Sequence, residues 1–209
     1  MTEIRTKETP PIDSTDAAWV TIRSDLPADK VFAILSDVEV LLRINPYYYF
    51  ESLSVADNSY TMQLTNHSNQ QNTQTSFTCT HGENRLELVY RDFIKKRTVL
   101  EVKADNTGCV ITLSDDYSNL SEPEREKRVD EVDKSLNAWG EAILTYLSRI
   151  KRWSWLPGWR TYMRRFWIPM KPSARRIVWM LYLVTVVEFF FFLFVMLIYV
   201  LEQMKPDIF

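Results

Sequence analysis

The chain has 209 residues, of which 46% are hydrophobic, enough for one domain with its own core. Two cysteines exclude a disulfide-stapled fold, and four isolated glycines exclude a glycine-rich phosphate loop. The net charge of −2 hides an asymmetry, because residues 1–141 carry 15 Lys/Arg and 24 Asp/Glu whereas residues 142–209 carry 10 and 3. A basic part beside an apolar segment indicates membrane contact rather than nucleic-acid binding.

The N-terminal quarter predicts an arm, a strand and two helices. Residues 1–16 are polar and contain Pro10-Pro11, which is typical of a flexible arm. Residues 18–23 alternate between apolar and polar types and predict a strand. A helix is expected to start near Pro27, and a second short helix, capped by residues 36–39, is expected to end before Pro46.

After Pro46 the apolar residues recur with a period of two, which predicts strands separated by turn residues. The expected strands are residues 48–55, 60–65, 73–80, 85–90, 98–104 and 110–118. Short strands at near-regular spacing indicate an antiparallel meander.

A long helix is expected to begin at Ser121-Glu122-Pro123. Its apolar residues recur every three or four positions and predict a stripe that faces the sheet. These residues are Val129, Val132, Leu136, Trp139, Ile143 and Leu147.

This order of elements, together with segment 26–37, resembles the START-like superfamily, also called SRPBCC, whose helix-grip fold occurs in polyketide cyclases and the birch-pollen allergen. The resemblance covers residues 17–150 and implies an α+β fold, with a curved antiparallel sheet wrapped around the long C-terminal helix. Arg43-Ile44 departs from the pattern, since the family usually has Trp before the Asn-Pro-like turn.

The resemblance also implies an apolar cavity between the sheet and the helix. In that family the cavity commonly holds lipids, quinones, sterols or polyketides. We expect Val132, Leu136, Trp139 and Ile143 to line it. For Trp139 the alternative is plain core packing.

Candidate catalytic and metal sites are few. Cys79 and His81 share one face of a strand, but no second pair completes a metal site. Asp115 and Asp116 point to opposite faces, so they form no dyad, and the simplest interpretation is a strand end running into solvent. We therefore expect no catalytic residue, metal or cofactor, although a cyclase-like enzyme remains a third hypothesis. The basic connection 91–97 either contacts anionic lipid or forms a solvated hairpin tip.

Residues 151–172 form a basic, aromatic segment between the domain and the apolar C-terminal stretch. The spacing of its apolar residues places them on one face of a helix, opposite basic residues. The apolar face comprises Trp159, Tyr162, Met163, Phe166 and Trp167, and the other carries Arg160, Thr161, Arg164 and Arg165. This pattern is typical of a helix at the membrane interface, the alternative being a helix that packs on its own domain.

Residues 173–203 predict one transmembrane helix, followed by a short tail at 204–209. Within it, residues 177–201 carry a single charge, Glu188. At ~1.5 Å per residue this stretch crosses a hydrocarbon core of about 30 Å. Basic residues gather before the span and only Lys205 follows it, so the positive-inside rule predicts a cytoplasmic N-terminal domain and a C-terminus on the opposite side.

Glu188 lies near the middle of this span. A carboxylate there costs about 2.5–3.5 kcal/mol on insertion scales. Either Glu188 is protonated and tolerated, or the helix of a transmembrane protein partner covers it.

Two functional hypotheses follow. The first is a single-pass protein that binds or presents a hydrophobic molecule, a lipid or a quinone, at the membrane surface. The START-like family includes coenzyme Q-binding proteins and a membrane-anchoring subunit associated with carbon monoxide dehydrogenase. The second is an accessory or assembly subunit of a membrane complex, docking through its transmembrane and interfacial helices. The expected partners are therefore the lipid bilayer, a hydrophobic cargo and a transmembrane protein, and not nucleic acid.

Overall fold

The computed structural model describes residues 16–56, 59–67 and 70–203, with all side chains in these ranges except those of residues 122, 124–134, 172 and 173. Most of the predicted arm and the tail 204–209 lie outside the described residues. The chain divides into two compact units, Met1–Pro169 and Met170–Phe209, each of which is described by itself.

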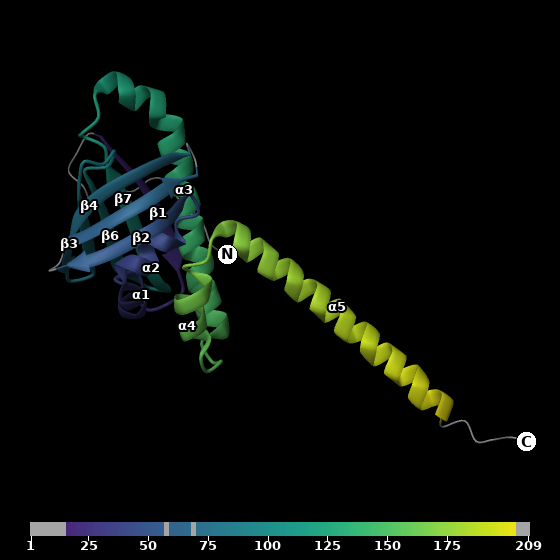
Figure 1. The fold of residues 1–209 in the computed structure, drawn as a ribbon. Helices are drawn as coiled ribbons and strands as arrows, with labels where there is room; N and C mark the ends of the chain where they lie inside the picture. Colours follow the sequence, from purple (N-terminus) through teal and green to yellow (C-terminus); the bar gives the residue numbers. More distant parts are fainter. Residues whose placement is uncertain (1–15, 57–58, 68–69, 204–209) are drawn as a thin grey trace, which may run out of the picture. The chain divides into compact units, whose positions relative to one another are not determined.

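The first unit contains seven strands and a long helix (Figure 1). The strands are β1 (Ala17–Ser24), β2 (Tyr48–Ala56), β3 (Ser59–Asn66), β4 (Gln71–Gly82), β5 (Arg85–Arg91), β6 (Arg97–Asp105) and β7 (Gly108–Asp116). The helices are α1 (Ala28–Leu35), α2 (Val38–Ile44), α3 (Glu122–Trp153), α4 (Trp159–Tyr162) and the π-helix η1 (Met163–Trp167). The predicted order of elements is confirmed, with strand ends displaced by at most two residues.

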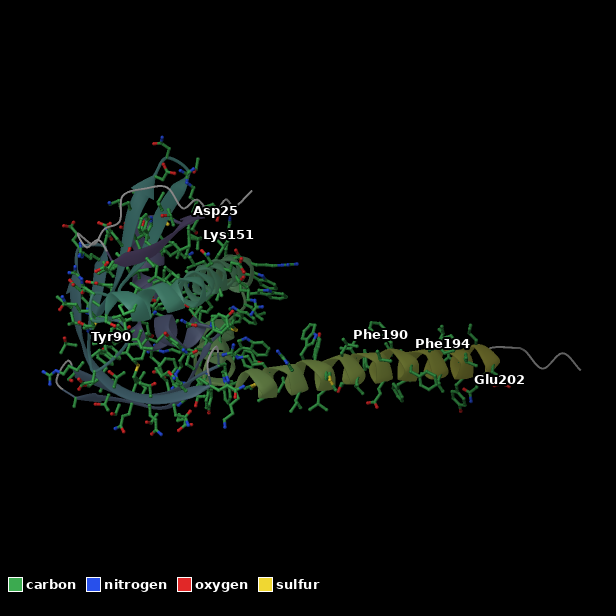
Figure 2. All side chains as sticks on the ribbon, turned by 90° about the horizontal axis from the view of Figure 1, so that it is seen from above. Asp25, Tyr90, Lys151, Phe190, Phe194 and Glu202 are labelled. Carbon is green, nitrogen blue, oxygen red and sulfur yellow. The ribbon has the colours of Figure 1, made fainter. Side chains whose placement is uncertain are left out.

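The strands form one antiparallel sheet in the order β1-β7-β6-β5-β4-β3-β2. β2 to β7 are a meander in which each strand pairs with the next, and β1 closes the order by pairing with β7. A register shift between Phe50 and Ser52 marks a bulge, a feature that bends a strand. The sheet curves around α3 (Figure 2), and the predicted α+β helix-grip architecture is confirmed.

The core lies between the sheet and α3. Alternate residues of each strand point inward, so that Val20, Leu113 and Leu100 form one buried cross-strand row. From α3, the predicted stripe residues Leu136, Trp139, Ile143 and Leu147 are all buried in the same core. Gly140 allows this close packing, because a Cβ at that position would lie 3.1 Å from Val20 Cγ2.

The two short helices connect the sheet to α3. Pro27 precedes α1, and Asp37 caps α2 by accepting a hydrogen bond from the Val40 N–H at 3.4 Å. α1 contacts β6 and β7, whereas α2 contacts β2 and α3. Their buried residues, including Val31, Leu35 and Leu41, therefore extend the core.

The basic segment after the domain differs from the prediction in two ways. α3 continues through residues 151–153, which the sequence placed in the interfacial segment. After Gly158, whose φ of 83° is left-handed, the expected single α-helix becomes α4 followed by the π-helix η1. A π-helix has a wider turn than an α-helix, so side-chain directions change at Met163.

The second unit is the helix α5 (Pro172–Gln203). Its residues Ala174–Gln203 have a mean hydropathy of 2.6 over the most apolar window, none of which is buried. Figure 2 shows Phe190 and Phe194 projecting from α5 without covering groups. Among the described residues it is the one helix long and apolar enough to cross a membrane, as predicted.

Candidate functional site

A cluster of polar side chains lies inside the apolar interior. The carboxylate of Asp115 in β7 is fully buried, and Lys95 Nζ donates a hydrogen bond to its Oδ2 at 2.5 Å. The Thr98 hydroxyl donates to Asp115 Oδ1 at 2.5 Å, and the Tyr117 hydroxyl lies 3.4 Å from Oδ2. Because Asp115 pairs with Thr98 across the β6–β7 ladder, both side chains share the inward face.

The β5–β6 connection carries Lys95 into this interior. Asp92 takes a left-handed conformation with a φ of 52°. The Tyr90 N–H then donates to the Lys96 carbonyl at 3.0 Å, and the Lys96 N–H donates to the Asp116 carbonyl at 2.8 Å. These bonds hold the connection against β7, so Lys95 is buried while Lys96 stays exposed.

One expectation from the sequence is therefore incomplete, and another is wrong. The connection 91–97 is not simply a lipid-contacting loop or a solvated tip, because Lys95 points inward. Asp115 and Asp116 do not run into solvent, since both are buried. Asp116 points to the opposite face, as expected, where its Oδ2 accepts a hydrogen bond from Arg97 Nε at 3.0 Å. The inward position of Lys95 depends on backbone hydrogen bonds of the connection, and the spacing of residues in the sequence does not predict these bonds.

Aromatic rings surround the ammonium group of Lys95. Its Nζ lies 5.1 Å from the centroid of the Trp139 ring and 5.6 Å from that of Tyr48, distances at which cation–π attraction operates. Burial opposes the charge, but the Asp115 carboxylate holds the pKa of Lys95 well above its usual value. Burial also raises the pKa of Tyr117 and Tyr90 above the ordinary phenol value, so both hydroxyls remain protonated donors.

This cluster is chemically suited to hold the polar end of an apolar molecule. An ammonium group has three donors, and within the described residues Lys95 uses one, on Asp115. A carbonyl or hydroxyl oxygen among these rings would accept a hydrogen bond from Lys95. The same low dielectric that makes an unpaired buried polar group costly strengthens such a bond.

Of the residues expected to line the ligand cavity, Trp139 lies beside this cluster. Leu136, Trp139 and Ile143 are buried on the α3 face toward the sheet, whereas the side chain of Val132 lies outside the described part of the chain. Trp139 is oriented by its indole Nε1–H, which donates to the Leu41 carbonyl at 3.1 Å. Its ring packs in the core, which is one of the two alternatives proposed for it, and also contacts Lys95.

Sequence reasoning missed Lys95, Thr98 and Asp115 as a group, although one signal for Asp115 was present. In β7 the inward residues are Cys109, Ile111 and Leu113, and Asp115 continues the same period of two. A carboxylate in phase with buried residues indicates an inward group that needs a partner.

A surface groove of about 690 Å³ lies between the end of β1, the β6–β7 turn and the C-terminal half of α3. Lys151 of α3 forms an ion pair there with Asp25, which lowers the pKa of that carboxyl, and Figure 2 shows the two side by side. Cys109 also borders the groove, but burial raises the pKa of its thiol to about 11. A thiol that stays protonated is a poor nucleophile.

Cys79 and His81 do not extend to a metal site. Cys79 Sγ lies 3.6 Å from His81 Nδ1, and burial raises the pKa of Cys79 to about 11. Over the residues that the structure describes, no group of three His, Cys, Asp or Glu side chains converges.

An aromatic ladder, defined as Trp153, Trp159, Tyr162 and Phe166, runs along the basic segment. Its successive ring centroids are 5.6, 6.2 and 6.1 Å apart. Tyr162 and Phe166 are exposed, and Trp155 nearby is 74% exposed. Of the other residues predicted for the membrane interface, Arg160, Arg164 and Arg165 are exposed, Trp167 is half-buried and Met163 is buried. The predicted apolar face therefore divides into a solvent side and a side toward the domain.

Glu188 lies on the exposed surface of α5, between the exposed apolar residues Val187 and Phe189. The helix itself gives its carboxylate no covering element.

Comparison with protein-family models and with curated proteins finds no match. Among solved structures, protein Ms6760 from Mycobacterium smegmatis is similar over 68% of this chain and 97% of its own, with 15% identity and a TM-score of 0.50. At this identity the likeness concerns the fold. The chain has the helix-grip fold. Two further similarities to the helix-grip domain have TM-scores below 0.5 and add no weight.

The first of these is an AHSA1-like protein from Aeromonas hydrophila, with 10% identity over 62% of this chain and 93% of its own and a TM-score of 0.43. The second is the di-domain ARO/CYC StfQ of the steffimycin biosynthetic pathway, with 9% identity over 61% of this chain and 49% of its own and a TM-score of 0.47. At such identities a likeness concerns the fold and not the activity.

Proposed function

We propose that this protein is a membrane-anchored helix-grip domain that binds a hydrophobic molecule, a lipid or a quinone, and presents it at the membrane surface. The observation that carries the proposal is the polar cluster of Lys95, Thr98, Asp115 and Tyr117 beside the apolar core. A buried ion pair adds little stability over a hydrophobic replacement, so a binding role accounts for it better than packing does. The cluster suits a cargo with an apolar body and one oxygen-bearing end.

The apolar helix α5 supports the membrane part of the proposal. Its segment Ala174–Gln203 is 30 residues long, which exceeds the ~20 needed to cross a bilayer, and its most apolar window has no protein cover. A tether of this kind raises the concentration of membrane-dissolved cargo at the domain. The basic residues before the span place the helix-grip domain on the cytoplasmic side in this proposal.

Native mass spectrometry of the full chain, purified from its own host in mild detergent, tests the proposal. We expect a bound mass of a few hundred daltons that is lost from the double variant Lys95→Met/Asp115→Leu. Removing both charges avoids leaving one of them unpaired, so this variant is expected to fold. Lys96→Met is the matched control, because Lys96 is exposed one residue away. An empty wild-type protein, or equal occupancy in the double variant, would contradict the proposal.

A second candidate function rests on Glu188. Its exposed carboxylate in the middle of α5 favours a transmembrane protein partner, and hence an accessory or assembly subunit. We expect Glu188→Leu to abolish co-purification of that partner, whereas Glu202→Leu, at the end of the same helix, leaves it intact. Unchanged co-purification with Glu188→Leu would remove the argument for a partner.

A further inference from the structure

A basic cleft of about 590 Å³ lies on the surface of the first unit beside the aromatic ladder. It is formed by α2, α4 and η1 and by the residues that follow η1. Its lining residues are Glu39, Arg160, Thr161, Arg164, Arg165 and Pro169. Three arginines and one threonine therefore border a single hollow together with one glutamate.

The ion pairs around the basic cleft leave it positive. Arg164 Nη2 bonds Asp37 Oδ2 at 2.9 Å, which attaches η1 to the N-cap residue of α2. Arg43 Nε bonds Glu39 Oε1 at 2.9 Å, so the one carboxylate of the cleft is already neutralised. Over the described residues, neither Arg160 nor Arg165 forms an ion pair. Two uncompensated cations thus remain beside the Thr161 hydroxyl.

The position of the basic cleft along the chain places it near a bilayer. The segment that lines it also carries the exposed rings of Tyr162 and Phe166, and such rings are favoured at the headgroup level of a membrane. In the sequence, only two residues separate Pro169, which lines the cleft, from Pro172, where α5 begins.

We propose that the basic cleft binds the phosphate of an anionic phospholipid headgroup. The planar fork of a guanidinium group matches two phosphate oxygens, and a hydroxyl donates to a third. The remaining positive charge disfavours the choline ammonium of a zwitterionic lipid. The proposal rests on the membrane anchoring in the proposed function, and it is independent of any cargo in the interior.

Binding of short-chain lipids to the detergent-purified full chain, measured by native mass spectrometry, tests this site. We expect dioctanoyl phosphatidylglycerol to bind at least about tenfold tighter than dioctanoyl phosphatidylcholine, a difference of ~1.4 kcal/mol. Arg160→Gln/Arg165→Gln should abolish the preference. Arg164 is left unchanged because its bond to Asp37 holds η1 in place. The matched control, Lys96→Gln/Arg149→Gln, removes two exposed cations outside the cleft and should keep the preference.

Equal affinity for the two lipids in the wild type, or an unchanged preference in Arg160→Gln/Arg165→Gln, overturns the proposal. A loss of preference in the control overturns it too, because net charge would then suffice. Inorganic phosphate at the same concentration as the lipid should not compete, and full competition would mean that the cleft recognises free phosphate instead. The interior cargo is detected in the same spectra, so failure of the cleft is distinguishable from failure of the proposed cargo binding.

Discussion

Lys95 and Asp115 depend on each other because both are buried. Each charge has given up its hydration, and their mutual hydrogen bond at 2.5 Å restores part of that energy. If either charge were removed, the other would keep only neutral neighbours, which are the rings of Tyr48 and Trp139 beside Lys95 and the Thr98 and Tyr117 hydroxyls beside Asp115.

We expect Lys95→Met to lower the free energy of unfolding by about 3–5 kcal/mol, because it leaves Asp115 buried without its cation. Lys95→Met/Asp115→Leu should recover most of this loss. Urea unfolding of the full chain in micelles, followed by tryptophan fluorescence, measures both. Lys96→Met should leave the free energy of unfolding nearly unchanged. An equal loss in Lys96→Met and Lys95→Met would show that the buried pair is not formed.

The two thiols give a second prediction at this scale. Burial raises the pKa of both Cys79 and Cys109 to about 11. At pH 8 the thiolate is then about one thousandth of the total, and alkylation requires the thiolate. Iodoacetamide should leave both residues unmodified in the folded protein and modify both in urea, as mass spectrometry would show. Modification of either thiol without denaturant would contradict the packing around it.

At the scale of elements, α3 packs closely on β1 at Gly140. A Cβ there would lie 3.1 and 3.3 Å from the two γ-carbons of Val20, so a small side chain is tight and a large one clashes. This position explains why a helix with an otherwise regular apolar stripe contains a glycine in its interior, where helix propensity disfavours it by about 1 kcal/mol.

Gly140→Leu should therefore destabilise the domain by about 1–3 kcal/mol or more through overpacking. Val20→Ala in the same chain should recover part of the loss, because it removes the γ-carbons that the new side chain meets. Urea midpoints of the two single variants and the double variant measure the coupling. Purely additive effects would mean that the helix and the strand are not in contact at this point.

The segment from α4 to η1 shows where helical periodicity fails as a guide. Spacing placed Met163 with Phe166 on one face, but the wider turn of the π-helix buries Met163 and exposes Phe166. Trp153 is the last residue of α3 and precedes the Pro157-Gly158 break, whereas Trp159 follows it. The two rings are nevertheless neighbours in the aromatic ladder, and no local sequence pattern predicts this contact.

At the scale of the whole molecule, the positive-inside rule predicts which side of the membrane each unit occupies. Burial raises the pKa of both native thiols, so neither Cys79 nor Cys109 is expected to react with a maleimide. A single reporter cysteine can therefore be added while both native cysteines are kept. Thr145 is an exposed residue of α3, and Thr145→Cys should react with an impermeant maleimide only after the membrane is permeabilised. Gln203→Cys, at the end of α5, should react in intact cells or organelles. The reverse pattern would invert the proposed topology.

The sequence by itself determined the features that repeat locally: the period-two strands, the α3 stripe and the apolar length of α5. Each depends on residues a few positions apart, so spacing is sufficient evidence. The tertiary structure alone decided that Lys95 meets Asp115, 20 positions away along the chain, and that three arginines converge beside Glu39. These contacts depend on a left-handed turn at Asp92, on strand register and on the packing of η1 against α2, and none of these is encoded in a local period.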